Sequence, residues 1–152
     1  MVPEPRLQSP VAIRPLSPEG RGSFCRTFTA APTDIDELGH VNNAVWVRWI
    51  QDMATAHWGC QATPEHIEKY IWVVVRHEID YRGNLKVGES VEGRTWIEDA
   101  PTGAKFDRHV AFVKDGKTLV QAKTTWAIID KATQRILRVP KDVTARFLGS
   151  ET

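Results

Sequence analysis

One short segment of the chain gathers residue types that acyl-transfer chemistry uses. It starts with Asp36, contains His40, and ends with Asn42 and Asn43, after which an apolar stretch begins. Either asparagine is suited to cap a helix, whose first turn leaves backbone N–H groups unpaired at the positive end of its dipole. Those N–H groups can stabilise the oxyanion that forms when a carbonyl is attacked. Because the segment has no serine or cysteine, its carboxylate suits a carbonyl that is already activated, such as that of a thioester.

The same residues also have a purely structural interpretation. Asp and Asn before a helix are most often turn and capping residues, and an imidazole such as that of His40 can simply bond a backbone carbonyl. On residue types alone, this structural interpretation is favoured by about two to one. The segment by itself therefore does not establish an activity.

The stretch after the segment predicts a long helix that begins at Ala44 and ends at Gly59. Its apolar residues follow the i, i+3, i+4, i+7 spacing of one helix face, and other apolar residues flank that face. Only a narrow polar stripe remains, so this helix must be covered on most of its sides. The apolar face comprises Trp46, Trp49, Ile50, Met53, Ala54 and His57.

After a short helix expected at residues 64–70, the chain has β character almost to its end. Alternating polarity and β-branched residues predict strands at 23–30, 71–81, 90–97, 105–114 and 118–129. Asp115-Gly116 is a strong hairpin signal, and Pro140 starts a short terminal helix. One strand, one long helix and then four consecutive antiparallel strands predict an α+β domain over residues 23–150, in which the sheet curls around the helix.

Composition limits the class of protein further. The 152 residues carry a formal net charge of +1, which gives no field suited to nucleic acid or to an anionic membrane. Two separated cysteines, Cys25 and Cys60, fit a reducing cytoplasm better than a disulfide framework. The sequence offers neither a membrane-spanning stretch nor a secretory signal pattern. Residues 1–22 hold five of the nine prolines and are expected to form an extended arm.

The segment and its surrounding elements resemble the hotdog-fold acyl-CoA thioesterase family, in the branch that contains 4-hydroxybenzoyl-CoA thioesterase. The resemblance covers residues from about Phe24 to Leu148. The His-Val-Asn-Asn element is also similar to that of plant acyl-carrier-protein thioesterases, although those enzymes have Asn where Leu38 stands. The motif consists of Asp36, Gly39, His40, Val41, Asn42, Asn43, Ala44 and Trp46, and later matches lie at 73–81, 86–89 and 137–140.

The resemblance implies a role for each matching residue. Asp36 would be the nucleophile or the base for a water, and its spacing to Gly39 favours it over the neighbouring carboxylate of Asp34. The backbone amide of Asn43 would be the oxyanion donor, and His40 would orient the acid or the substrate carbonyl. The implied substrate contacts are Gly39, Asn42 and Trp46, to which His77 is added as a polar residue expected near the helix end.

These roles predict an acyl-CoA hydrolase that works without a metal or redox cofactor, as a homodimer or homotetramer with active sites between subunits. His57, Cys60 and His66 have only a faint metal-ligand spacing. The alternatives are an acyl-carrier-protein thioesterase and a non-catalytic acyl-binding module. A third alternative is a hotdog hydratase or dehydratase, but the sequence has neither the Gly-Asp-x-Asn-Pro nor the His-x-Pro-Gly pattern of those enzymes. Five cations could bind the phosphates of coenzyme A, but charges on strands and turns are usually solvated, so none is assigned to such a site. They are Arg82, Lys86, Arg108, Lys114 and Lys123.

Overall fold

The computed structural model describes residues 23–148, so the proline-rich arm expected at 1–22 lies outside the described residues. One antiparallel sheet has the strand order β1-β3-β4-β5-β2, with the short β6 paired to β5. The strands are β1 (Phe24–Thr29), β2 (Tyr70–Tyr81), β3 (Ser90–Trp96), β4 (Lys105–Lys114), β5 (Lys117–Asp130) and β6 (Ile136–Leu137). The helices are the 3-10 turn η2 (Pro32–Asp34), α1 (Asn43–Gln61), α2 (Pro64–Lys69) and α3 (Lys141–Leu148).

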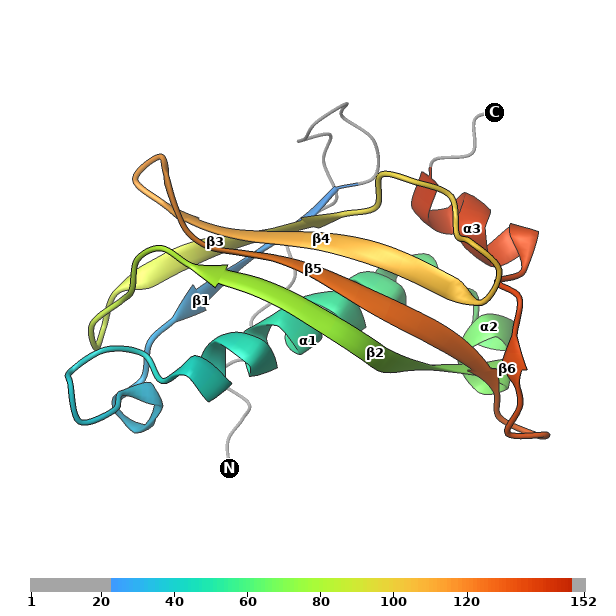
Figure 1. Cartoon of the computed structure of the whole chain (residues 1–152), viewed down its shortest axis with the longest axis horizontal. Helices are drawn as coiled ribbons and strands as arrows, with labels where there is room; N and C mark the ends of the chain where they lie inside the picture. The colour runs from blue at the N-terminus through green and yellow to red at the C-terminus, as the bar shows by residue number, and fades with distance from the viewer. Residues whose placement is uncertain (1–22, 149–152) are drawn as a thin grey trace.

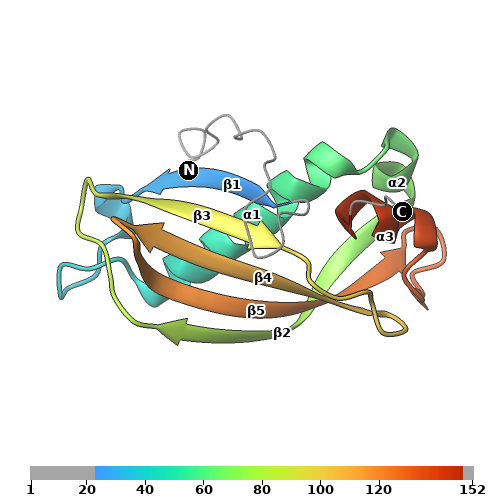
Figure 2. The ribbon, with the colours of Figure 1, turned by 90° about the horizontal axis from the view of Figure 1, so that it is seen from above.

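The sheet curls over α1, which lies along its concave face (Figures 1 and 2). The helix buries its predicted apolar face, with Trp46, Trp49, Ile50 and Met53 each no more than 2% exposed. The predicted α+β hotdog arrangement, a sheet wrapped around one long helix, is confirmed. In Figure 1 the loop before α1 lies at one end of the molecule, and α2 and α3 lie at the other end.

The expected four-strand meander is wrong at its first step, because β2 pairs with β5 and not with β3. The connection at residues 82–89 therefore crosses the end of the sheet, past β4 and β5, to reach β3. Leu85 fixes this crossing, since its side chain is fully buried and its carbonyl accepts the amide of Val41 at 3.1 Å. Polarity patterns identify strands but not their neighbours, and this crossing has no local signal.

Two smaller expectations also need correction. α1 does not end at Gly59 but continues to Gln61. The helix stops where Thr63, the residue before Pro64, is held in an extended conformation and caps α2 by accepting the His66 amide. Strand β6, which was not predicted, is only two residues long and too short for a pattern of alternation to be recognised.

The space between α1 and the sheet is filled by two groups of buried side chains. The helix-start cluster packs the first half of α1 against β1, β3, β4 and β5, and its largest members are Trp46, Trp49, Phe24, Phe28 and Phe112. The helix-end cluster joins the start of β2 to β4, β5 and α3, and includes Tyr70, Phe106, Ile128, Val143 and Phe147. The two clusters occupy opposite ends of the same layer.

Gly93 of β3 shows how tightly the helix-start cluster is packed. A Cβ at this position would lie 3.0 Å from the Met53 sulfur and 3.1 Å from ring atoms of both Phe28 and Phe112. We expect Gly93→Ala to lower the free energy of unfolding by about 1–3 kcal/mol through overpacking. Gly59→Ala is the matched control, because no atom lies within 4 Å and alanine favours helix by roughly 0.5–1 kcal/mol. Urea unfolding of both variants measures the difference, and equal stability would contradict it.

Candidate active site

The loop before α1 is a closed turn fixed by backbone hydrogen bonds. An antiparallel bridge joins Ile35 to Val41 at its base. Inside this bridge the Asp36 amide donates to the His40 carbonyl at 2.8 Å, and the Gly39 amide donates to the Asp36 carbonyl at 3.0 Å. Gly39 has a φ of +82°, a backbone conformation that favours glycine. The loop therefore holds Asp36 in a defined position beside the start of α1.

The carboxylate of Asp36 takes part in this loop with one of its oxygens. Oδ1 accepts the backbone amide of Leu38 at 2.9 Å and that of His40 at 3.3 Å. Among residues 23–148, no donor is bonded to the other oxygen, Oδ2, and the residue is only half-buried. Both interpretations of Asp36 thus hold in part: it stabilises the turn, and one oxygen stays available to a substrate or a water.

Asp34, the rival carboxylate, is fully engaged. Its Oδ1 accepts from the Arg48 guanidinium at 3.0 Å, and its Oδ2 accepts the Ala31 amide at 2.9 Å. The Asp34 side chain is only 5% exposed. A buried carboxylate with an ion pair and a capping bond is a structural group, which leaves Asp36 as the chemically available carboxylate of the loop.

Capping at the start of α1 leaves one backbone amide outside the cap. Asn42 is the N-cap, and its side-chain oxygen accepts the Ala44 amide at 2.8 Å. The Val45 amide donates to the Asn42 carbonyl at 2.9 Å. Asn43 is the first helical residue and is exposed. Its amide comes before the Ala44 and Val45 amides, which are bonded to Asn42. The arrangement supplies a donor at the positive end of the α1 dipole.

The other predicted site residues differ in their surroundings. His40 is half-buried in the loop, and within residues 23–148 its imidazole has no hydrogen-bond partner. Trp46, expected to wall an acyl pocket, is instead a core residue: it is 0% exposed and packs edge-on against Trp49 and Phe112. Its place on the most buried face of α1 explains why it cannot reach a ligand without repacking the core.

His77 lies on β2, on the face of the sheet that contacts α1. Its Nδ1 is 3.0 Å from the Thr124 hydroxyl on the neighbouring strand, and partial burial lowers the pKa of the imidazole. Strand register aligns Thr124 with both His77 and Arg108, so a polar row crosses β2, β5 and β4. His77 is thus already bonded within the sheet, and its contact with substrate stays a prediction.

A cavity of about 260 Å³ lies at the other end of α1, beside the helix-end cluster. Its walls are mainly aromatic, and α1 contributes Ala54, Thr55 and Trp58. These residues follow Asn43 by 11 to 15 positions, or roughly 16–22 Å along the helix axis. The cavity and the Asp36 loop of one chain are therefore too far apart to hold one short substrate group together.

Arg108 lines this cavity and is almost completely buried. One guanidinium nitrogen, Nη1, is 3.0 Å from His57 Nδ1 and 2.9 Å from the Thr95 hydroxyl. Burial lowers the Arg108 pKa to about 10, and burial together with the Arg108 charge lowers the His57 pKa well below its usual value. His57 is therefore neutral, with Nδ1 as acceptor. The alternation of Phe106, Arg108 and Val110 contained the signal for an inward-facing arginine, but a charged strand residue was interpreted as solvated.

Because folding holds His57 neutral, stability should depend on pH. The folded-state pKa lies below the unfolded value near 6.5, so the unfolded chain binds more protons as the pH falls through 6.5. We expect the free energy of unfolding to fall by about 1 kcal/mol per pH unit below that point. Urea unfolding between neutral and mildly acidic pH measures this slope. His57→Asn should flatten the slope; equal slopes in wild type and His57→Asn would contradict the expectation.

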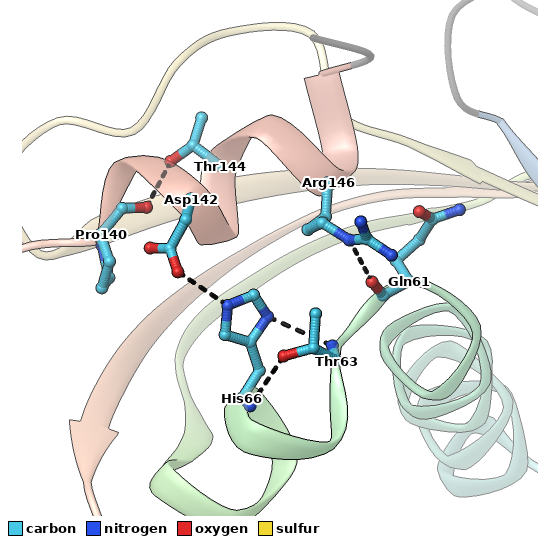
Figure 3. A network of polar contacts seen from close by, with 7 residues as sticks. All are labelled: Gln61, Thr63, His66, Pro140, Asp142, Thr144 and Arg146. Carbon is cyan, nitrogen blue, oxygen red and sulfur yellow. Dashed lines mark hydrogen bonds and ion pairs between the residues drawn. The ribbon is translucent and has the colours of Figure 1, made fainter.

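His66, another of the metal-ligand candidates, belongs to a polar network at the same end of the molecule (Figure 3). His66 Nδ1 accepts the Thr63 amide at 3.3 Å, so its Nε2 donates to the Asp142 carboxylate at 2.9 Å and lowers the Asp142 pKa. Arg146 of α3 donates to the Gln61 carbonyl at 2.6 Å. The network fixes α2 and α3 beside the cavity, and residues 23–148 contain no group of three or more metal-ligating side chains.

Comparison with known proteins agrees with this fold. A Staphylococcus aureus protein solved in complex with CoA superposes with a TM-score of 0.74 at 16% identity, covering 83% of this chain and 82% of that one. The 1,4-dihydroxy-2-naphthoyl-CoA thioesterase of Synechocystis gives 0.68 at 15% identity, covering 83% and 96%. An acyl-ACP thioesterase from Bacteroides thetaiotaomicron gives 0.68 at 26% identity, covering 76% and 49%.

Among curated proteins, the palmitoyl-acyl carrier protein thioesterase of Arabidopsis thaliana is 32% identical over 87 residues, 56% of this chain. The chain spans only 21% of that relative's length. Residues 30–147 match the thioesterase-like superfamily, a region that includes the Asp36 loop, α1 and every later element except the last residue of α3. The chain therefore belongs to the thioesterase-like superfamily. No helix in the described part of the chain is long and apolar enough to cross a membrane.

Proposed function

We propose that the protein hydrolyses the thioester of an acyl-CoA to a free acid and CoA, with Asp36 as the reacting carboxylate. The observation that carries the proposal is that the two carboxylates before α1, those of Asp34 and Asp36, have different hydrogen-bond partners. Asp34 is neutralised by Arg48, whereas Asp36, in the loop before α1, keeps one oxygen to which no donor within residues 23–148 is bonded. Membership of the thioesterase-like superfamily supports thioester chemistry.

The proposed reaction follows from these groups. Acting as a base, Asp36 takes a proton from water while the water oxygen bonds to the thioester carbon. Acting as a nucleophile, it forms an acyl anhydride that water then hydrolyses. In either case the carbonyl oxygen gains negative charge, which the Asn43 amide and the α1 dipole stabilise. When this charge returns to the carbonyl, the C–S bond breaks. As a base, Asp36 gives the proton that it took from water to the leaving sulfur; as a nucleophile, it forms the anhydride as the CoA thiolate leaves, and the thiolate takes a proton from solvent.

We propose a homodimer as the working unit, paired through the open edge of β2. This strand has 12 residues, and in the described part of the chain it has no neighbour on one side. Such an edge pairs readily with another strand unless charge or proline blocks it. Large exposed apolar side chains gather on β2 and next to it: Ile67, Ile71, Val73, Val75 and Tyr81 are 38–52% exposed. A tetramer would require a second interface.

The dimer would also bring an Asp36 loop close to a cavity, although the two lie far apart within one chain. Antiparallel pairing of two β2 strands about a two-fold axis reverses the direction of α1 in the second subunit. The Asp36 loop of the partner subunit then lies at the end where β2 begins and the cavity opens, near Tyr70 and Ile71. In this arrangement each active site combines a cavity from one subunit with a carboxylate from the other.

Acyl carrier protein is the second candidate carrier, because the Arabidopsis and Bacteroides relatives are named for it. The two carriers share the thioester and differ in what surrounds the phosphopantetheine arm. Cys60 carries a free, exposed thiol, which supports a reducing compartment such as the cytoplasm as the place of action.

The test is steady-state hydrolysis of matched acyl groups presented on CoA and on acyl carrier protein. Release of free thiol from acyl-CoA with a higher kcat/KM than from the protein carrier supports the proposal. A preference for the protein carrier assigns the second function instead. Tight binding of acyl-CoA without turnover of either substrate would overturn both and indicate an acyl-binding module.

A further inference from the structure

The cavity beside the helix-end cluster has an unusual charge. Among the described residues its lining includes two cations, Arg108 and Lys131, and no carboxylate. Arg108 is only 6% exposed, and its hydrogen-bonding side-chain partners, His57 and Thr95, are both neutral. Among residues 23–148 no acidic side chain forms an ion pair with it. Asp107 precedes it in the sequence but bonds Thr125 on the opposite face of the sheet.

A buried guanidinium without an anion is costly, because it loses its hydration and gains no opposite charge. The ring of Phe147, whose centroid is 5.6 Å from the guanidinium carbon, offsets only part of this cost. The surroundings also hold the arginine firmly in place: Thr95 is fully buried and itself donates to the His109 carbonyl at 2.8 Å. A fixed, unpaired cation that faces a cavity is a binding site for an anion.

We propose that this cavity receives an acyl group whose far end is a carboxylate, and that Arg108 binds that carboxylate. The inference rests on the proposed thioesterase function and names its substrate class. The volume of about 260 Å³ suits such a group, since an engineered cavity of about 150 Å³ binds benzene. The apolar part of the acyl group would pack on the aromatic walls, formed by Trp58, Tyr70, Trp72, Phe106, Trp126 and Phe147.

An acyl group with an apolar end fits this cavity less well. It would cover Arg108 and provide no hydrogen-bond acceptor in return. A terminal carboxylate instead accepts hydrogen bonds from the guanidinium in a site with low dielectric. Lys131 lines the same cavity and adds positive charge, although its ammonium already donates to the Ile67 carbonyl at 2.8 Å.

The kinetic test compares adipoyl-CoA with hexanoyl-CoA, which differ only in the terminal carboxylate. For the wild type we expect kcat/KM to be higher for adipoyl-CoA by roughly 30-fold or more, the range of a buried charge pair. Arg108→Met should remove this preference, and Arg108→Lys should keep part of it because the charge remains. Arg135→Met, at an exposed position outside the cavity, is the matched control and should leave the preference unchanged.

A binding measurement keeps the test independent of catalysis and of folding. Titration calorimetry should detect binding of adipate but not of its uncharged diamide, adipamide, to the wild type, and Arg108→Met should lose adipate binding while its circular dichroism spectrum stays that of the wild type. Adipate binding without hydrolysis of any thioester would overturn the proposed function and leave this site intact. A preference for hexanoyl-CoA, or adipate binding that survives in Arg108→Met, would overturn the carboxylate site itself.

Discussion

Replacing Asp36 with asparagine is expected to lower kcat for acyl-CoA hydrolysis by roughly 10²- to 10⁴-fold, the contribution of a positioned acid or base. Asparagine keeps an oxygen that can accept the Leu38 and His40 amides, so the loop should retain its shape. It removes the negative charge and the ability to take a proton or to attack a carbonyl. Steady-state kinetics with thermal unfolding of the same samples separates the chemical effect from a structural one.

Two neighbouring carboxylates serve as controls for this result. Glu37→Gln changes an exposed residue of the same loop and should leave kcat nearly unchanged. Asp34→Asn breaks the contact with Arg48 and should reduce stability more than it reduces kcat. If Asp36→Asn hydrolyses acyl-CoA at the wild-type rate, Asp36 is only the structural residue of its turn.

Truncation of Trp46 is expected to have the largest effect on stability. This side chain is fully buried between Trp49 and Phe112, and its removal leaves a cavity that the surrounding rings cannot fill. We expect Trp46→Ala to lower the free energy of unfolding by about 3–5 kcal/mol, measured by urea unfolding. Ile136→Ala, at a position that is 63% exposed, should change stability by less than about 0.5 kcal/mol.

The same variant distinguishes a core role from a ligand-binding role. A core residue affects stability first, and the remaining folded enzyme should keep a KM close to that of the wild type. If Trp46→Ala were as stable as the wild type but raised KM strongly, then Trp46 would line the acyl site, and the assignment of the cavity at the far end of α1 would be wrong.

Local patterns were sufficient to predict most elements of the fold. Strand β4 has the predicted bounds Lys105–Lys114, because its alternation is regular and a tight turn follows it. In that turn both Asp115 and Gly116 have positive φ, as the Asp-Gly hairpin signal predicts. The apolar face of α1 was also predicted correctly, since a helix that is apolar on most sides has few ways to be buried.

What the sequence could not predict depends on contacts between distant residues. The pairing of β2 with β5 results from a chain crossing that Leu85 anchors, and no local pattern encodes it. The burial of Arg108 depends on neutral partners from α1 and β3, His57 and Thr95, which lie far from it in the sequence. Trp46 was assigned to a pocket wall by resemblance, whereas in this chain the core cluster takes up its whole surface.

The candidate site was predicted in part. Residue type and position left either Asn42 or Asn43 as the N-cap of α1, and the structure assigns this role to Asn42. The choice of Asp36 over Asp34 gained a physical reason only from Arg48, which stands 14 residues further along the chain and whose pairing could not be anticipated. The catalytic role of Asp36, the amide of Asn43 and the contacts of His40 and His77 stay predictions until kinetics test them.

The central claim is that each active site combines Asp36 of one subunit with the cavity of the other. Its most direct test is a mixed dimer of Asp36→Asn and Ala54→Phe subunits, co-expressed with different tags and purified through both, where Ala54→Phe fills the cavity from α1. Each variant alone should be almost inactive. In the mixed dimer one site receives both defects and the other none, so we predict about half of the wild-type kcat per dimer. Activity no higher than that of either variant alone would contradict a shared site.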